Sequence, residues 1–142
     1  MHLFCFPLSF QNVEETNSNS STLGDHYVPL FVRMLGLDND PLDREQSIVA
    51  LWKYSLGGKK CIDNIMQFQG SINLTVNLLK SESRSTREAA AGLLRSISSI
   101  NQYRDVVAES GAVEEIISLL SHPSLPPDVK EFLIFKYLFL YK

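Results

Sequence analysis

One helical passage occurs twice in this chain of 142 residues. Residues 43–54 read DREQSIVALWKY and residues 86–97 read TREAAAGLLRSI, and in both an Arg-Glu pair precedes apolar residues at helical spacing. The two pairs lie 43 residues apart, and Lys130-Glu131 continues the series at the same interval. This repeat constrains the fold strongly, because a unit of this size cannot bury its own apolar face and must stack on a similar unit.

An apolar stripe precedes each of these passages. Three segments, beginning at Val28, Ile72 and Val113, carry residues at i, i+3, i+4 and i+7, with Thr75 at one position of the middle stripe. This spacing is typical of one face of an amphipathic helix. We interpret the stripes as core-forming faces of three helices and not as a cofactor site.

Local signals predict where the helices begin and end. Asp40 precedes a proline and is expected to cap one long helix, and Ser85 with Glu88 predicts a capping box at the next. Gly70 and Gly111 follow shorter apolar series and predict left-handed turns between two helices. Each unit is therefore expected to contain a short helix, a glycine turn, a helix, a polar loop and a longer helix, with a period of about 42 residues.

The chain is expected to divide into a leader and a repeat region. Residues 11–25 are polar, rich in Ser, Thr and Asn, and lack a hydrophobic period, so residues 1–25 are predicted to be a flexible N-terminal leader. Helical repeats are predicted over residues 26–142. Their approximate bounds are 26–58, 59–100 and 101–142, the last being malformed.

Units of this length with two or three helices are typical of the HEAT and armadillo classes. The passages VALWKYSLGGKKCIDNIMQFQGSI and GLLRSISSINQYRDVVAESGAVEEIISLL resemble the armadillo family, and the resemblance covers roughly residues 26–131. LDNDPLDREQSIVALWKYSLGGKK is similar to plant armadillo-repeat proteins in particular, some of them plastid-associated. The resemblance implies an all-α fold, an armadillo-type right-handed superhelix of about three repeats.

Third helices of such a superhelix line a concave groove suited to extended peptides. In armadillo proteins that bind nuclear-localisation peptides, these helices carry Trp-x-x-x-Asn pairs; the pairs here are Val49 with Lys53, Gly92 with Ser96, and Phe135 with Phe139. Trp52 falls in the core register instead, so a nuclear-import receptor is not expected. A merely solvated helix face is the alternative interpretation. The candidate protein-binding residues of the groove are Glu45, Val49, Lys53, Glu88, Gly92 and Ser96.

Other kinds of chemistry lack support in the sequence. The net charge of −3 argues against nucleic-acid binding, which needs a basic excess. LGGKK at residues 56–60 fails the phosphate-loop pattern, because Lys53 and Lys60 stand where a glycine and a Ser or Thr are required. The histidines lie far apart and are not at ligand spacing with either cysteine. We predict no catalytic, cofactor-binding or metal site, and we do not expect an enzyme.

The two cysteines, Cys5 and Cys61, form no disulfide framework, which favours an intracellular, reducing compartment. The N-terminal MHLFCFPLSF lacks the basic region of a secretory signal. The cytoplasm is the expected location, with the plastid as an alternative.

The last eleven residues, FLIFKYLFLYK at 132–142, include nine aliphatic or aromatic residues and have no polar face. Terminal repeats of natural solenoids usually carry a polar outer face. We favour truncation of a longer solenoid after Glu131. Cover by a partner or a second copy, and attachment to a membrane surface, are the alternatives.

The sequence therefore predicts a non-catalytic protein–protein interaction module, a scaffold or adaptor that binds a protein or an extended peptide and is a shortened form of a longer solenoid. One alternative is an accessory substrate-binding part of a larger enzyme, such as a plant ubiquitin ligase. The other is a membrane-peripheral protein held through residues 132–142, a segment that could also support self-association.

Overall fold

The computed structural model describes residues 20–121 of the chain. The first part of the predicted leader, the Lys130-Glu131 pair and the apolar tail lie outside the described residues. Between residues 20 and 121 the regular structure consists of seven helices and includes no strand. They are α2 (Ser20–Arg33), α3 (Pro41–Ser55), α4 (Lys59–Met66), α5 (Ser71–Leu78), α6 (Arg84–Ser98), α7 (Asn101–Glu109) and α8 (Ala112–Leu120).

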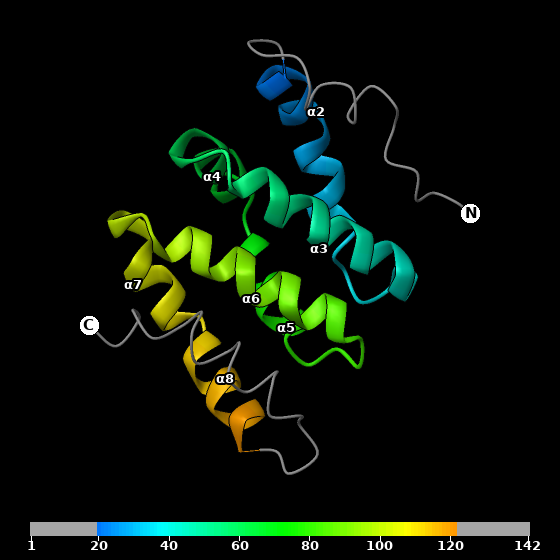
Figure 1. Cartoon of the computed structure of the whole chain (residues 1–142), viewed down its shortest axis with the longest axis vertical. Coiled ribbons are helices and arrows are strands. Elements are labelled where there is room, and N and C mark those ends of the chain that lie inside the picture. The colour runs from blue at the N-terminus through cyan, green and yellow to red at the C-terminus, as the bar shows by residue number, and fades with distance from the viewer. Residues whose placement is uncertain (1–19, 122–142) are drawn as a thin grey trace.

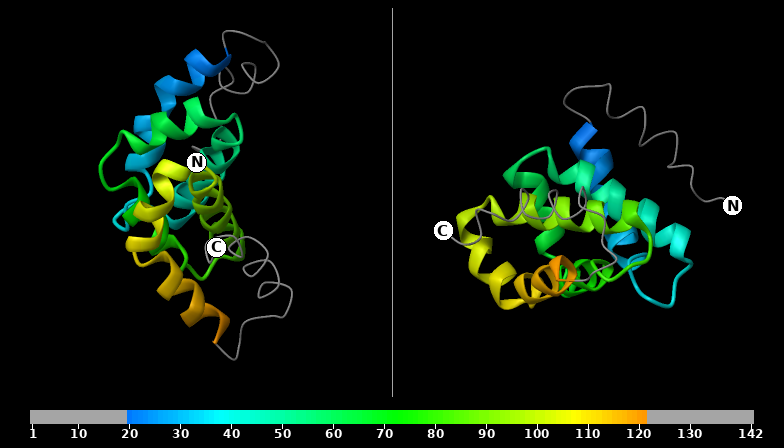
Figure 2. Two further views of the ribbon diagram at one scale, coloured as in Figure 1. Left: turned by 90° about the vertical axis from the view of Figure 1, so that its left-hand side faces the viewer. Right: turned by 60° about the horizontal axis from the view of Figure 1, so that its bottom comes forward.

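The helices form stacked units of the predicted kind. Helices α2 and α3 belong to the first unit, α4 to α6 to the second, and α7 with α8 to the described part of the third (Figure 1). The long helices α3 and α6 lie side by side and run in the same direction, and α2 and α5 pack behind them. Figure 2 shows α3 and α6 together on one side of the stack.

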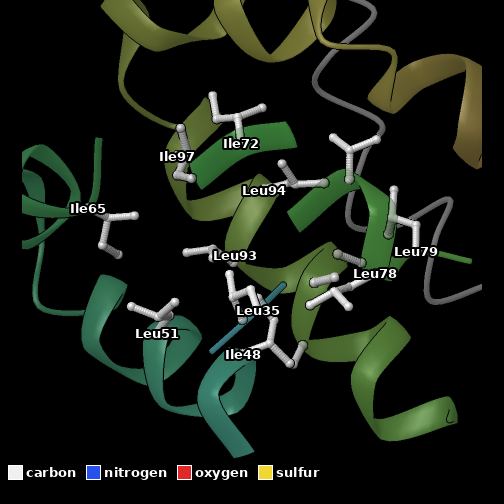
Figure 3. Packing of buried hydrophobic residues seen from close by; sticks show 14 of the residues in the cluster. Leu35, Ile48, Leu51, Ile65, Ile72, Leu78, Leu79, Leu93, Leu94 and Ile97 are labelled. Atoms are coloured by element: carbon white, nitrogen blue, oxygen red, sulfur yellow. The ribbon is translucent and has the colours of Figure 1, made fainter. Parts of the chain in front are cut away.

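The first two predicted stripes belong to the core. All four residues of the first stripe and all four of the second are buried, Thr75 included. Figure 3 shows Leu51 of α3 and Leu93 of α6 meeting between the two long helices. The third stripe is different, since Ile117 is 50% exposed. Its prediction as a core residue is wrong, and in α8 the neighbouring Ile116 is the stripe residue that is buried.

The recurring arginine of the Arg-Glu pairs has a structural role. The Nη1 atom of Arg44 donates to the carbonyl oxygens of Leu37 and Asn39, at 3.1 and 2.5 Å. Arg87, 43 residues later, donates from Nη1 to the carbonyls of Ser81 and Glu82, at 2.8 and 3.1 Å. Carbonyl groups in such loops have no helical partner, so both arginines stabilise the loop before their helix.

Most of the predicted helix ends are confirmed. Asp40 caps α3 by accepting a hydrogen bond from the backbone nitrogen of Leu42 at 2.9 Å. Gly70 and Gly111 have φ values of 88° and 91°, in the left-handed region where a side chain would be strained. Both glycines directly precede a helix, so they set the turn between a short helix and the next one.

The predicted start of α6 needs correction. Ser83, not Ser85, is the N-cap, and its Oγ accepts a hydrogen bond from the backbone nitrogen of Thr86 at 3.2 Å. Glu88 does not complete a capping box, because its carboxylate pairs with Arg84 one turn earlier at 2.9 Å. The extended backbone at Ser83, φ −78° and ψ 122°, is the conformation that an N-cap requires.

A polar cluster joins the first three described helices. Tyr54 of α3 donates a hydrogen bond to Asp25 of α2. Asn64 of α4 donates to Asp25 Oδ1 and to the Tyr54 hydroxyl, both at 2.8 Å. Burial raises the pKa of Tyr54 well above its ordinary value, and burial likewise raises the pKa of the neighbouring Cys61 thiol. Helix α2 begins at Ser20, so the predicted leader boundary at residue 25 falls inside a helix.

A second polar cluster joins α4 to α7. The hydroxyl of Tyr103 donates to Asp63 Oδ1 at 2.5 Å, and the Lys59 ammonium lies 2.7 Å from Asp63 Oδ2. The hydrogen bond from Lys59 contributes most to lowering the pKa of Asp63, and the hydrogen bond from Tyr103 contributes next. The same hydrogen bond to Asp63 raises the pKa of Tyr103 to about 12. Adjacent units are thus connected through their short helices as well as their long ones.

We expect Tyr54→Phe to lower the free energy of unfolding by about 1–2 kcal/mol, because a half-buried carboxylate and amide lose a shared partner. Urea denaturation followed by circular dichroism measures the change. Tyr103→Phe is the comparison variant, and its loss should be smaller because the pair at Asp63 is more exposed to solvent. Equal losses, or the reverse order, would contradict this assignment.

The raised pKa of Tyr103 predicts a loss of stability in alkali. The protonated hydroxyl contributes fully below the unfolded pKa of about 10, and its contribution disappears as the pH rises through the folded pKa of about 12. Between pH 10 and 12 the melting temperature of the native chain should therefore fall more steeply than that of Tyr103→Phe. Parallel melting curves for the two proteins would refute the prediction.

Candidate protein-binding face

The six predicted groove residues come from the two long helices that lie side by side. Glu45, Val49 and Lys53 belong to α3, and their partners 43 residues later, Glu88, Gly92 and Ser96, belong to α6. We call these six positions, together with Trp52, the α3–α6 face. Their roles in binding stay a prediction, but the structure differentiates them clearly by burial and by hydrogen-bond partner.

Both carboxylates of the face already have partners. Glu45 Oε1 accepts a hydrogen bond from the hydroxyl of Ser83 at 2.6 Å, which connects α3 to the N-cap of α6. Glu88 Oε1 accepts from Arg84 Nε at 2.9 Å, within α6. Glu45 therefore has a structural role between units, and Glu88 a weaker one along its own helix.

Trp52 packs over Gly92, a residue that the sequence placed on the groove surface. Gly92 is buried beneath the indole of Trp52, and a Cβ atom at residue 92 would lie 2.3 Å from Trp52 Cε2. Trp52 is only half-buried, although it packs against the core. The prediction of Gly92 as a groove-lining surface is therefore wrong, because the Trp52 ring covers it. The sequence did contain a signal for this contact. Residues 89–92 read AAAG, and such a run of small residues leaves room for a large side chain from a neighbouring helix.

The C-terminal ends of the two helices are basic. Lys53 and Arg95 occupy the last turns of α3 and α6, where a positive charge compensates the helix dipole. Lys53 is exposed and forms no ion pair with any residue between 20 and 121. Val49 and Ser96 are half-buried, and Leu56, just after α3, is 68% exposed.

A groove of about 840 Å³ lies at the opposite, N-terminal ends of α3 and α6. Leu37 and Leu42 form its apolar side and are 66% and 51% exposed. Sequence reasoning missed both leucines, because neither belongs to an apolar stripe. Glu45 is the one predicted residue among those that line the groove: Leu37, Pro41, Leu42, Arg44, Glu45, Asn77, Leu78, Lys80, Ser81, Glu82 and Ser83.

Among residues 20–121, no three His, Cys, Asp or Glu side chains gather closely enough to hold a metal ion. In that span no helix has both the length and the apolar character that crossing a bilayer requires.

Comparison with known proteins identifies the fold. No protein-family model matches the sequence, and no curated protein matches it. In three dimensions the chain is similar to a crystal structure of computationally designed armadillo repeat proteins for modular peptide recognition, with 18% sequence identity and a TM-score of 0.78. The match covers 94% of this chain and 56% of the designed one, so this chain spans just over half of that protein's length.

The fold is therefore an all-α solenoid of the armadillo type, and the prediction from the 43-residue interval is confirmed. The narrower similarity to plant armadillo-repeat proteins stays a prediction, because neither sequence comparison returns a match.

Gly92→Ala should displace Trp52 and lower the free energy of unfolding by about 1–2 kcal/mol. Overpacking, at about 1–3 kcal/mol, outweighs the gain of about 1 kcal/mol in helix propensity. Because Trp52 is the single tryptophan, its emission should also shift to the red as the ring moves into solvent. In a Trp52→Leu background the same substitution should become stabilising. A stabilising effect in the native background would refute the packing argument.

Proposed function

We propose that this protein is a non-catalytic protein–protein interaction module, a scaffold or adaptor, which holds an extended segment of its partner against the α3–α6 face. The observation that carries the proposal is the pairing of α3 and α6 as parallel neighbours with the half-buried Trp52 ring between them. Armadillo-like repeats generally bind proteins or peptides, and the similar designed proteins were made for modular peptide recognition.

The spacing of the helices favours an extended ligand. Packed helices lie about 8–10 Å apart, and a strand-like segment advances about 3.3 Å per residue. About three residues of such a segment therefore cross each long helix. Equivalent positions on α3 and α6 would therefore contact parts of the segment about three residues apart, so one extended segment can reach both helices.

The chemistry of the face also favours binding over simple solvation. Val49 and Trp52 offer apolar surface that a ligand could shield from water. Beside them, the exposed ammonium of Lys53 offers a charge that no described residue neutralises. Interfaces commonly combine an aromatic anchor with polar groups at its edge.

Replacing Lys53 and Ser96 with glutamate should weaken binding at this face by at least about tenfold, a change of about 1.4 kcal/mol. Binding segments are first selected from a library of random twelve-residue peptides displayed on phage and then titrated against both proteins. The helical circular-dichroism spectrum should not change, because neither side chain is fully buried.

The matched control variant is Arg33→Glu with Ser118→Glu, which makes the same changes at exposed positions of α2 and α8. This control should bind the selected peptides as the native chain does. Equal binding by the Lys53 and Ser96 variant, or an equal loss in the control, would rule out the α3–α6 face as the contact surface.

A further inference from the structure

We propose that the α3–α6 face selects extended segments in which an acidic residue and an apolar residue lie two positions apart, and that Lys53 is the residue that determines this selectivity. The inference deepens the proposed function and rests on it, because it names the chemistry of the ligand held at the same face. It follows from a difference between the three charged residues of the face. Glu45 and Glu88 have hydrogen-bond partners, whereas Lys53 forms no ion pair with any described residue.

Three of the seven residues of the face are charged, and the two carboxylates among them already have hydrogen-bond partners. The carboxylate of Glu45 accepts from Ser83 at 2.6 Å, and that of Glu88 accepts from Arg84 at 2.9 Å. A basic ligand would have to compete with these contacts, and breaking the first would disturb the link between two units. The ammonium of Lys53 has no such competitor among residues 20–121, so a carboxylate can approach it directly.

The surroundings of Lys53 strengthen the positive potential at this end of the face. Arg95 occupies the last turn of α6, as Lys53 does that of α3, and Lys60 is exposed at the start of α4. The nearby carboxylate of Asp63 is already paired with Lys59 at 2.7 Å. The negative end of each helix dipole, equivalent to about half a unit charge, offsets one full cationic charge only in part.

Apolar surface lies directly beside this charge. The Trp52 ring rests on Gly92, Val49 is half-buried one turn before Lys53, and Leu56 is 68% exposed just beyond it. An extended segment points successive side chains to opposite sides. A ligand whose acidic and apolar residues lie two positions apart presents both on the same side, so it can place a carboxylate at Lys53 and an apolar group over the neighbouring indole.

Overall charge acts against this selectivity, which makes the test more demanding. The chain has a net charge of −3 and at long range repels an acidic ligand. At about 0.15 M salt the screening length is about 8 Å, so contacts within the face outweigh the charge of the whole protein. Binding is therefore measured at this ionic strength.

The experiment uses the full chain and three fluorescein-labelled twelve-residue peptides, titrated by fluorescence anisotropy. The first repeats Asp-Ser-Phe-Ser three times, and the other two replace every Asp with Asn or with Lys. We expect the Asp peptide to bind at least tenfold more tightly than the Lys peptide, with the Asn peptide between them. Lys53→Glu should reverse the order, and Arg33→Glu, an exposed substitution on α2, should preserve it.

The possible results separate this inference from the proposed function. Equal or tighter binding of the Lys or Asn peptide overturns the acidic selectivity, and so does an order that Lys53→Glu leaves unchanged. If none of the three peptides binds, the selectivity also fails. The proposed function itself then depends on the phage selection, and it falls only if that library yields no segment that requires Lys53 and Ser96.

Discussion

The packing of α3 against α6 is the contact on which the other features of the structure depend. Its centre is apolar, with Leu51 of α3 and Leu93 of α6 fully buried. Burying one such side chain contributes about 1.5–3 kcal/mol, whereas a typical hydrogen bond contributes about 0.5–1.5 kcal/mol net. Apolar burial therefore supplies most of the attraction between the first two units. The small residues from Ala89 to Gly92 allow α3 to approach closely and leave room for Trp52.

Polar contacts add register to this attraction, and they are of two kinds. Contacts within a unit recur along the chain, as when Arg44 and Arg87 bind the carbonyl groups of the preceding loop. Contacts between units differ from one junction to the next: Asn64 of α4 binds Asp25 of α2, whereas Tyr103 of α7 binds Asp63 of α4. A contact that every unit makes internally requires the same residue in every unit, as with Arg44 and Arg87. A junction occurs once, so its residues need not repeat.

This division decides which charges remain for a partner. Arg44 and Arg87 stabilise the loop before their helix, and Glu45 connects two helices. These side chains have structural roles even where part of them reaches solvent. Lys53 is exposed and forms no ion pair with any described residue, and the Trp52 ring, which packs on the core, remains half-exposed. The functional surface of such a solenoid is thus what remains after the requirements of stacking have been met.

The sequence by itself determined the repeating unit, the first two core stripes, the left-handed glycines and the cap at Asp40. These features depend on backbone preferences and on residues within one or two helical turns, so local pattern is sufficient to predict them. Only the tertiary structure decided that Asp25 belongs to a polar cluster, that Ser83 caps α6, and that Trp52 covers Gly92. The Asp25 and Trp52 contacts join residues about 40 positions apart, and the hydroxyl of Ser83 also binds Glu45, 38 positions away. They arise from the way one unit stacks on the next, which no single helix encodes.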